Sequence, residues 1–361
     1  MNRSPGKSRR QNRYWRFHLT EMPFMSDTIE VDDALQAIEL YAERGWTDGL
    51  PIVPPTEGLV AQFVNALGVS PDTVLGVEPT KGAVITAEKA AINAVMAGCK
   101  PEYMRVLAAA IDAVTTPVFG LHGISVSTMG AAVLMIVNGP VASELGMNSG
   151  VSVFGPGNRA NASIGRAMRL IIINVLGTRA GDLDKATVGH PGKYTWCIAE
   201  NEDLSPWEPV HVTRGEPADG SAVTVAAGLG PFQVGQHHDD SPERILDAFI
   251  DPLFAMGPLM PEALIVLCPE HLEHFRDAGW EKARVGQYLY ENALRSVEDW
   301  AFAGRPVPGR DSSDTEPVSA LASPESMITI VAGGGGGAWS QIIPTWTHGA
   351  RSGAVTKPVS A

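Results

Sequence analysis

The stretch Ala131-Ala-Val-Leu-Met-Ile-Val-Asn138-Gly-Pro140 decides the fold class of this chain. Its seven apolar residues in a row fall far short of the roughly 18 that a membrane span needs. The Asn-Gly-Pro sequence that follows is a strong turn signal. A short apolar run that ends in a turn is typical of a strand buried on both faces. The sequence therefore predicts a buried sheet in this part of the chain.

Helices are predicted on the N-terminal side of this strand. Apolar residues recur at helical spacing from Asp32 until Gly45, and further helices are expected at 57–67, 87–97 and 101–114. The first two helices are separated by Trp46-Thr-Asp-Gly-Leu-Pro-Ile-Val-Pro-Pro-Thr56, whose three prolines favour a rigid extended loop. The sequence therefore predicts a mostly helical portion over residues 25–130.

Strands and helices alternate on the C-terminal side. Strands are expected at 151–154, 194–199, 223–227, 264–268 and 327–332, and helices at 161–176, from Ser241 onward and at 281–302. Three of these strands run into glycine-rich turns. We predict an α/β or α+β fold in which the helical N-terminal portion packs on a mixed sheet in residues 131–361, as one compact unit with Gly-rich strand-to-helix turns. The Pro-, Ser- and Asp-rich residues 303–325 are predicted to form a linker or a long surface loop.

Residues 1–24 differ from the rest of the chain in charge. They carry six basic side chains against one acidic side chain, Glu21. Arg9 and Arg10 are not followed by the apolar region of an export signal. We interpret this segment as a disordered tail or an over-long translation start.

Charge and cysteine content exclude several classes of protein. The net charge of −13 argues against nucleic acid and anionic membranes as partners. The three cysteines are odd in number and lie far apart, so neither a disulfide framework nor a Cys-x-x-Cys site is predicted. We expect a soluble, cytoplasmic protein that forms a homo-oligomer.

The loop and helix over residues 148–166 form the first candidate binding site. Glycines allow backbone N–H groups to approach a ligand, and a helix N-terminus attracts negative charge. The residues predicted to bind an anionic substrate here are Gly155, Gly157, Arg159, Asn161 and Ser163. A tight turn followed by an ordinary helix cap would explain the same pattern. No nucleotide-binding fingerprint is present, and the sequence identifies no cofactor.

A second cluster follows in residues 189–202. His190 or Lys193, if close to Cys197, would lower the pKa of the thiol and favour a thiolate nucleophile, with Glu200 or Glu202 as acid or base. We therefore predict Cys197, His190 and Glu200 as catalytic residues and Lys193 as substrate-binding. The alternative is that Cys197 is a small core residue of a strand.

A run of glycines and several groups of histidine residues give weaker signals of a functional site. Gly335, in the five glycines 333–337, is predicted to hold a second anionic part of the ligand through backbone N–H groups. The run His237-His238-Asp239-Asp240 and the group Cys268, His271 and His274 lack metal-ligand spacing, so no metal site is predicted. His122 is a lone loop histidine.

Several long motifs resemble a known family. They are Asp48–Thr56, Glu88–Tyr103, Ile136–Pro140, Phe154–Gly157, Arg159–Ala162, His190–Tyr194 and Cys197–Trp207. Together they resemble a poorly characterised bacterial family associated with UGSC-motif (seleno)proteins and loosely labelled thioredoxin-like. The chain has no Cys-Gly-Ser-Cys motif and no selenocysteine equivalent. The resemblance implies at most a subunit of a redox or lyase system whose thiol resides on a partner protein.

Two functions follow from these observations as hypotheses. The first is an enzyme or catalytic subunit, a lyase or an oxidoreductase, that acts on a small anionic organic substrate by carbon–heteroatom bond cleavage or thiol-dependent reduction. The second is a non-catalytic partner subunit of a thiol or selenol protein. The density of Gly, Arg, Asn and His in irregular motifs favours a ligand site of some kind.

Overall fold

Two four-stranded sheets lie face to face at the centre of the molecule. The computed structural model describes residues 24–311, 313–346 and 353–360. Strands β12 (Val355–Pro358), β5 (Ala222–Gly228), β3 (Ala132–Asn138) and β4 (Cys197–Ala199) form the first sheet in that order. The second sheet has the order β10 (Met327–Val331), β7 (Ala263–Leu267), β11 (Trp339–Pro344) and β6 (Phe232–Gly235). Both sheets are mixed, because β3 pairs parallel with β4 and β10 pairs parallel with β7 while the other pairs are antiparallel.

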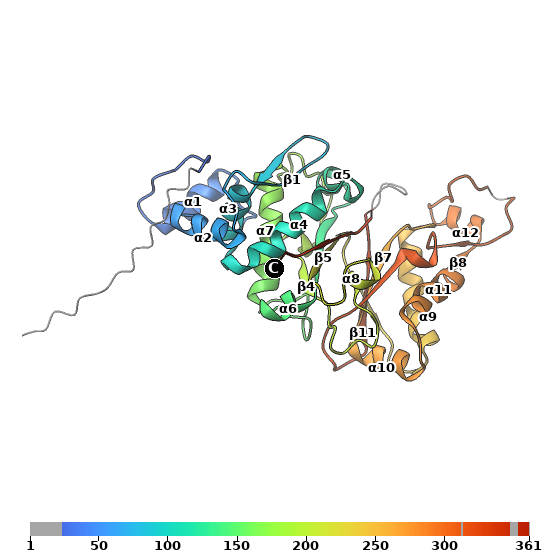
Figure 1. The fold of residues 1–361 in the computed structure, drawn as a ribbon. Coiled ribbons are helices and arrows are strands. Elements are labelled where there is room, and N and C mark those ends of the chain that lie inside the picture. Colours follow the sequence, from blue (N-terminus) through green and yellow to red (C-terminus); the bar gives the residue numbers. More distant parts are fainter. Residues whose placement is uncertain (1–23, 312, 347–352, 361) are drawn as a thin grey trace, which may run out of the picture.

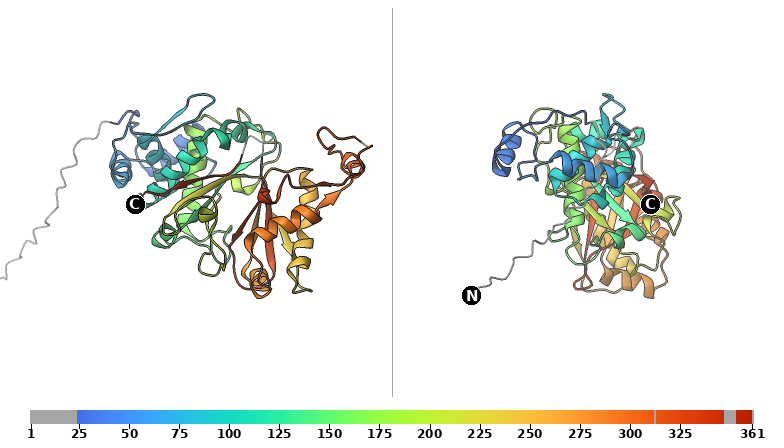
Figure 2. Two further views of the ribbon diagram at one scale, coloured as in Figure 1. Left: turned by 45° about the vertical axis from the view of Figure 1, so that its right-hand side comes forward. Right: turned by 60° about the vertical axis from the view of Figure 1, so that its left-hand side comes forward.

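Helices cover the outer face of each sheet, which gives four layers (Figures 1 and 2). The first sheet is covered by α4 (Met104–Thr115) and α7 (Arg159–Asn174). Helices α2 (Glu57–Leu67) and α3 (Ala87–Ala97) pack on these two, with α1 (Ala34–Glu43) beside them. The second sheet is covered by α9 (Pro242–Met256), α10 (Pro269–Asp277) and α11 (Lys282–Asn292). Smaller elements connect the layers: β1 (Val74–Val77), β2 (Val84–Thr86), α5 (Leu121–Val126), α6 (Pro140–Glu144), α8 (Val210–Thr213), β8 (Leu294–Arg295), α12 (Val297–Phe302) and β9 (Val318–Ser319).

The four layers explain the unbroken apolar run that begins at Ala131. In β3, Val133, Met135 and Val137 face the helices, while Leu134 and Ile136 face the second sheet. Because side chains alternate along a strand, both faces of β3 require apolar residues. Each fully buried Leu or Ile side chain contributes about 2 kcal/mol to the stability of such a core.

The α/β or α+β class predicted from the sequence is therefore confirmed, and so are most of the individual elements. Helices α2 and α3 have the predicted bounds, with Thr86 as the N-cap of α3 and Gly98 as its C-cap. Residues 1–24, interpreted above as a disordered tail or an over-long translation start, lie outside the described residues apart from Phe24. The described residues of 303–317 form a surface loop between α12 and β9 that is mostly exposed, with Val307 buried.

Two predicted elements are wrong. Residues 151–154 form turns instead of a strand, and Ser152 has a φ of 56°. The single helix predicted at 281–302 is divided into α11, the short strand β8 and α12. A new helix begins after Ser296, whose hydroxyl accepts a hydrogen bond from Asp299 N–H at 3.0 Å and so caps it.

Among the described residues, no single helix is long and apolar enough to cross a membrane. Two helical segments, Pro101–Thr115 and Pro117–Val126, are together long and apolar enough to cross a membrane by length and composition alone. The pair is bent by 71° at the break between them. Most of α4 within this pair is buried against the first sheet and its neighbouring helices.

Limited proteolysis is expected to cut first in the exposed loop 303–311. At the junction of the helical portion with β3, Gly130 is buried and only Thr128 and Met129 before it are exposed, so cleavage there should be slower than in the loop. Mass spectrometry of the early fragments is the measurement. Early release of a stable fragment that begins near Gly130 would show that residues 131–361 form a separate unit.

Candidate functional site

A cavity of about 770 Å³ lies beside α7, at one end of the first sheet. It is lined by the loop Gly45–Asp48, by α7 and by the segment from Arg179 to Tyr194. We call it the His190 cavity. Two motifs singled out in the sequence meet here although they are far apart in the chain, because Asp48 belongs to one and His190, Lys193 and Tyr194 belong to the other.

The loop that carries Asp48 is held in place by α7. Arg166 donates to Asp48 from Nε and from Nη2, each at 2.8 Å, in a bidentate ion pair. Arg166 Nη2 also donates to the carbonyl oxygen of Pro51 at 2.9 Å. The Asp48 carboxylate is almost completely buried. A charge-assisted fork of this kind fixes the position of the loop.

A buried ion-pair triad forms part of the cavity wall. The Asp184 carboxylate lies 2.8 Å from Lys193 Nζ and 2.9 Å from Arg169 Nη2, and its side chain is only 2% exposed. Burial raises the pKa of Asp184, but the bonds from Lys193, Ala186 N–H and Arg169 outweigh this effect and the pKa is lowered. The pKa of Lys193 is lowered, mainly by burial and against the opposing effect of Asp184. Asp184 therefore stays ionised between two cations.

His190 is fixed by backbone groups on both sides of its ring. Nδ1 accepts a hydrogen bond from Gly192 N–H at 3.2 Å, so Nε2 carries the proton and donates to the carbonyl oxygen of Gly228 at 3.3 Å. The ring also packs edge-on against Trp196, with centroids 5.0 Å apart. Burial lowers the pKa of His190 against the opposing effect of the Gly228 hydrogen bond, and the Lys193 charge lowers it further. The imidazole is therefore neutral at pH 7.

Lys193 approaches α7 because a glycine allows the backbones to come close. A Cβ atom at Gly165 would lie 2.6 Å from the backbone nitrogen of Trp196, closer than real Cβ contacts. Thr195 Oγ1 donates to the carbonyl oxygen of Ala162 at 2.7 Å in the same contact. The segment that precedes β4 is thus fastened to α7, on which Arg166 and Arg169 lie.

The cavity is positively charged although the protein is acidic. Arg169, Arg179 and Lys193 line it with Asp48 and Asp184, and Arg166 lies behind Asp48. Among the described lining residues, three cations stand against two carboxylates, an excess of one positive charge, while the chain has a net charge of −13. Arg179 is exposed and forms no ion pair with a described residue. A recess of this kind attracts small anions.

The three predicted catalytic residues are not brought together. Cys197 is 4% exposed and packs among the helices that cover the first sheet. The pKa of its thiol is raised by burial and by Cys99, so the structure does not meet the condition for a thiolate set out above. Glu200 follows the carboxyl end of β4, whereas His190 contacts Gly228 at the other end of the sheet. The length of β3 separates these two ends by about 20 Å.

Glu200 belongs instead to a buried polar cluster. Its Oε2 accepts hydrogen bonds from Asn138 Nδ2 and from Val210 N–H, each at 2.8 Å. Its Oε1 has no hydrogen-bond partner among the described residues and lies 3.7 Å from Lys282 Nζ. Burial lowers the pKa of Lys282, against the opposing effect of Glu200.

The two predicted glycine cradles lie next to each other, away from the His190 cavity. Gly333 N–H donates to the carbonyl oxygen of Ser149 at 2.9 Å, which joins the two loops. Gly155, Gly157 and Gly335 are all exposed. Glu270 accepts a hydrogen bond from Gly337 N–H at 2.7 Å, so a carboxylate of the protein occupies one donor of this cradle.

The polar side chains at the start of α7 have partners within the protein. Asn161 accepts from Asn148 N–H and donates to the Asn148 carbonyl oxygen, both at 2.9 Å. Ser163 Oγ donates to the carbonyl oxygen of Arg159 at 2.7 Å. Asn161 therefore holds the loop to the helix, whereas the Ser163 bond lies within α7.

Arg159 lies at the carboxyl end of α3. Its Nε donates to the carbonyl oxygen of Gly98 at 2.9 Å and its Nη2 donates to that of Cys99 at 3.3 Å. The carboxyl end of a helix carries partial negative charge. The positive charge of Arg159 is therefore balanced by the end of α3. The sequence had predicted that a substrate anion would balance it.

Arg159→Lys is accordingly expected to lower the free energy of unfolding by about 1 kcal/mol, because the charge remains but the paired bonds to α3 are lost. Urea denaturation measures this change. A variant that unfolds like the wild type but loses affinity for small carboxylates would instead support the anion-binding role of Arg159.

Sequence reasoning missed four charged residues of the cavity: Asp48, Arg169, Arg179 and Asp184. Asp48 lies in a quoted motif, and Arg169 lies three residues after Arg166 and thus on the same side of α7. Nothing local distinguishes Arg179 or Asp184, because their importance depends on contacts between distant segments.

Comparison with known proteins identifies no relative of this chain. No protein-family model matches the chain, and no curated protein matches it significantly.

Proposed function

We propose that this chain is an enzyme, or the catalytic subunit of one, that binds a small organic anion in the His190 cavity. The observation that carries this proposal is the excess of cations around the cavity in an otherwise acidic protein. The volume of about 770 Å³ lies within the range of small-molecule sites. Arg179, exposed and free of ion pairs with described residues, binds the anionic group of the substrate.

Acid–base chemistry suits the remaining side chains. Lys193 has a lowered pKa and is held by the Asp184 carboxylate, which makes its ammonium group a suitable proton donor. Cleavage of a carbon–heteroatom bond needs such a donor to protonate the leaving heteroatom. Burial lowers the pKa of His190, and the backbone fixes its ring, which shapes the wall and offers an edge to the substrate.

A reductive reaction would need a thiol from elsewhere. Cys99, Cys197 and Cys268 are all buried, and none is among the described residues that line the cavity. Thiol-dependent reduction is therefore proposed only for a complex in which a thiol or selenol partner protein supplies that group. Unpaired cysteines are usual in a reducing compartment, and we propose a cytoplasmic location.

A non-catalytic role in such a complex is the second candidate function, and exposed apolar groups at the cavity favour it. Val188 is 93% exposed and Tyr194 is 50% exposed, and both line the cavity. Exposed apolar side chains at the edge of a site are suited to contact with another protein. In this case the partner would cover the His190 cavity and supply the reactive group.

Turnover assays distinguish the two functions. The purified chain is incubated with a panel of small carboxylates, first alone and then with the proteins encoded beside it in its genome. Turnover by the chain alone, lost in Lys193→Met but kept in Lys81→Met, is the result expected for an enzyme. Turnover that appears only with a partner and survives Lys193→Met would favour the non-catalytic role.

A further inference from the structure

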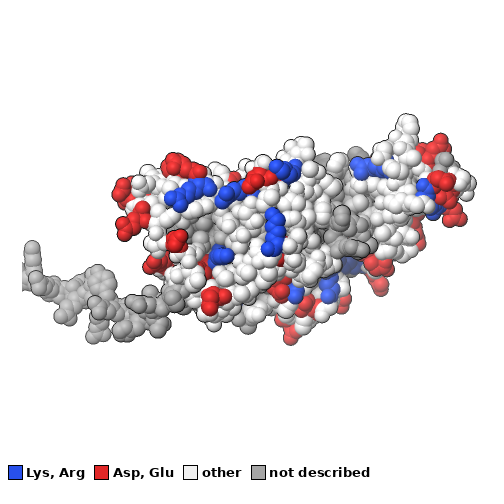
Figure 3. All heavy atoms as spheres, turned by 90° about the horizontal axis from the view of Figure 1, so that it is seen from above, with Lys and Arg blue, Asp and Glu red and all other residues white. Residues whose placement is uncertain are grey.

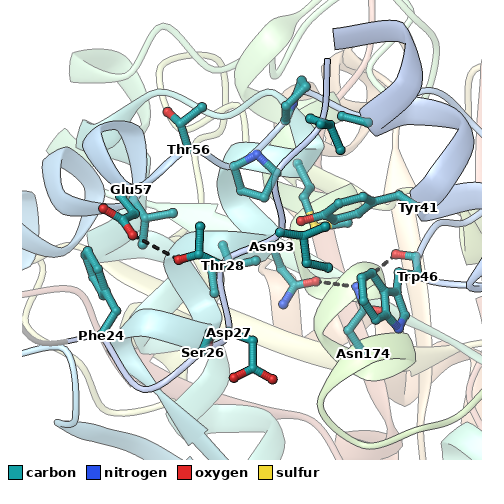
Figure 4. Close-up of a pocket in the computed structure, with 18 of the residues that line it drawn as sticks. Phe24, Ser26, Asp27, Thr28, Tyr41, Trp46, Thr56, Glu57, Asn93 and Asn174 are labelled. Carbon is teal, nitrogen blue, oxygen red and sulfur yellow. Dashed lines mark hydrogen bonds between the residues drawn. The ribbon is translucent and has the colours of Figure 1, made fainter. Parts of the chain in front are cut away.

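A larger cavity, of about 870 Å³, lies at the helical end of the molecule (Figure 4). Residues Phe24–Val31, which we call the strap, pass over α1, α2 and α3 and close one side of it. The buried Glu88 carboxylate accepts hydrogen bonds from Met25 N–H at 2.9 Å and from Ser26 N–H at 2.8 Å. Thr28 Oγ1 donates to Glu57 Oε1 at 3.0 Å. The first half of the strap is therefore anchored to α3 and α2.

Most of the wall is apolar. Leu40 comes from α1, Val60 from α2, and Ile92 and Met96 from α3, while Val31 of the strap faces them. The proline-rich loop adds Pro54 and Pro55. Such a wall holds the hydrocarbon or aromatic part of a ligand.

Hydrogen-bond acceptors lie among these apolar groups. Asn174 Nδ2 donates to Asn93 Oδ1 at 2.7 Å and to the Trp46 carbonyl oxygen at 2.9 Å. These bonds fix the orientation of the amide, and its Oδ1 is buried without a hydrogen-bond partner among the described residues. Figure 4 shows the ring of Tyr41 beside these two asparagine amides. Asn93 and Asn174 thus add fixed polar groups to an otherwise apolar wall.

The charge around this cavity is negative. Among the described lining residues, the carboxylates of Asp27, Glu57 and Glu88 face a single cation, Arg44. The Arg44 guanidinium lies over the Trp46 ring, 5.0 Å from its centroid. Acidic side chains gather over the end of the molecule that α1 and α2 form (Figure 3). The local field therefore favours a cation.

We propose that the strap cavity binds a small organic cation, a primary amine carried on an apolar or aromatic body. The ammonium group supplies three donors, which face the Asp27 and Glu57 carboxylates at the rim. The apolar body fills the space between Leu40, Ile92 and Met96. This site is independent of the proposed function of the His190 cavity.

The two cavities lie on opposite sides of one loop. Trp46 lines the strap cavity, while Gly45, Thr47 and Asp48 line the His190 cavity. The net charges of the two sites differ in sign, since cations exceed carboxylates by one among the described lining residues of the His190 cavity and carboxylates exceed cations by two in the strap cavity. An anionic ligand and a cationic ligand would thus be separated by the Gly45–Asp48 loop.

Calorimetric titration of the full chain with matched probes tests the proposal. The probes are 2-phenylethylamine, 2-phenylethanol and 3-phenylpropionate, which share an aromatic body but differ in charge. The amine is expected to saturate the protein and to bind more tightly than the other two, and added salt is expected to weaken it. Asp27→Asn with Glu57→Gln is expected to weaken the amine about fivefold. The control is Glu39→Gln with Glu43→Gln, which removes two charges of α1 that do not line the cavity and should have a smaller effect.

A cavity-filling variant gives a second readout. Ile92→Trp should abolish amine binding while thermal denaturation shows a folded protein. The proposal is overturned if the propionate or the alcohol binds as tightly as the amine, or if no amine binding is detected in the millimolar range. It is also overturned if the charge-removing pair and its control weaken the amine equally, a result that needs no data from Ile92→Trp.

Discussion

Replacement of Asp184 by asparagine is expected to destabilise the fold by about 3 to 5 kcal/mol, the cost of removing one partner from a buried ion pair. Asp184 is 4% exposed and compensates both Lys193 and Arg169. Without the carboxylate, two half-buried cations face each other with no counter-charge. Urea denaturation at neutral pH measures the loss.

The pH dependence of this loss follows from the pKa of Asp184. The folded-state pKa is lowered, so the carboxylate stabilises the fold fully above its unfolded-state pKa of about 3.9. This contribution is lost as the pH falls through the lowered folded-state value. The difference between wild type and Asp184→Asn should therefore keep its size down to about pH 4 and shrink below it. Asp182→Asn, at an exposed position two residues away, is the control and should change the stability little. Equal stability of the two variants would contradict the role given to the triad.

Replacement of Arg179 by glutamine is expected to weaken the binding of small carboxylates about tenfold to a hundredfold, the range of a charged hydrogen bond. The folded protein should be as stable as the wild type, because Arg179 is exposed and pairs with no described carboxylate. Calorimetric titration gives the affinity and thermal denaturation gives the stability.

Lys81→Gln is the matched control for Arg179→Gln. Lys81 is exposed and does not line the cavity. Its replacement therefore changes the net charge as much as Arg179→Gln does but leaves the site intact. If both variants weaken binding to the same extent, the effect comes from overall charge and the assignment of Arg179 fails.

The elements that local sequence signals define were predictable. The bounds of α2 and α3 follow from caps and apolar spacing, and β3 follows from its uninterrupted apolar run. The strands β6, β11 and β12 were missed, because short strands of mixed composition depend on their neighbours. β11 lies between β7 and β6 and is stabilised by pairing on both edges, which no local signal reveals.

The division of residues 281–302 had a local signal that the helical pattern concealed. Ser296 followed by Asp299 is an N-cap sequence, and their side chains also share a hydrogen bond of 2.8 Å. The pairing of Leu294 and Arg295 with β9 then interrupts the helix. Tertiary pairing thus overrides a weak helical preference over these residues.

Only part of the candidate site could be predicted from the sequence. His190 and Lys193 were singled out by their motif, and the structure places both on one cavity. Their partners Asp184, Arg169 and Arg179 come from segments that meet only in the folded chain. Cys197 and Glu200 lie near His190 in sequence but not in the fold. Cys197 is in β4 and faces the covering helices, and Glu200 follows the carboxyl end of that strand.

The central claim is that the His190 cavity recognises negative charge on a small organic molecule. Calorimetric titration of the chain with small dicarboxylates and with their neutral diamides tests it most directly, because each pair shares one shape. The account predicts that at least one dicarboxylate binds saturably, that its diamide does not, and that Arg179→Gln weakens the dicarboxylate. Equal binding of a dicarboxylate and its diamide, or no binding of any carboxylate, would contradict it.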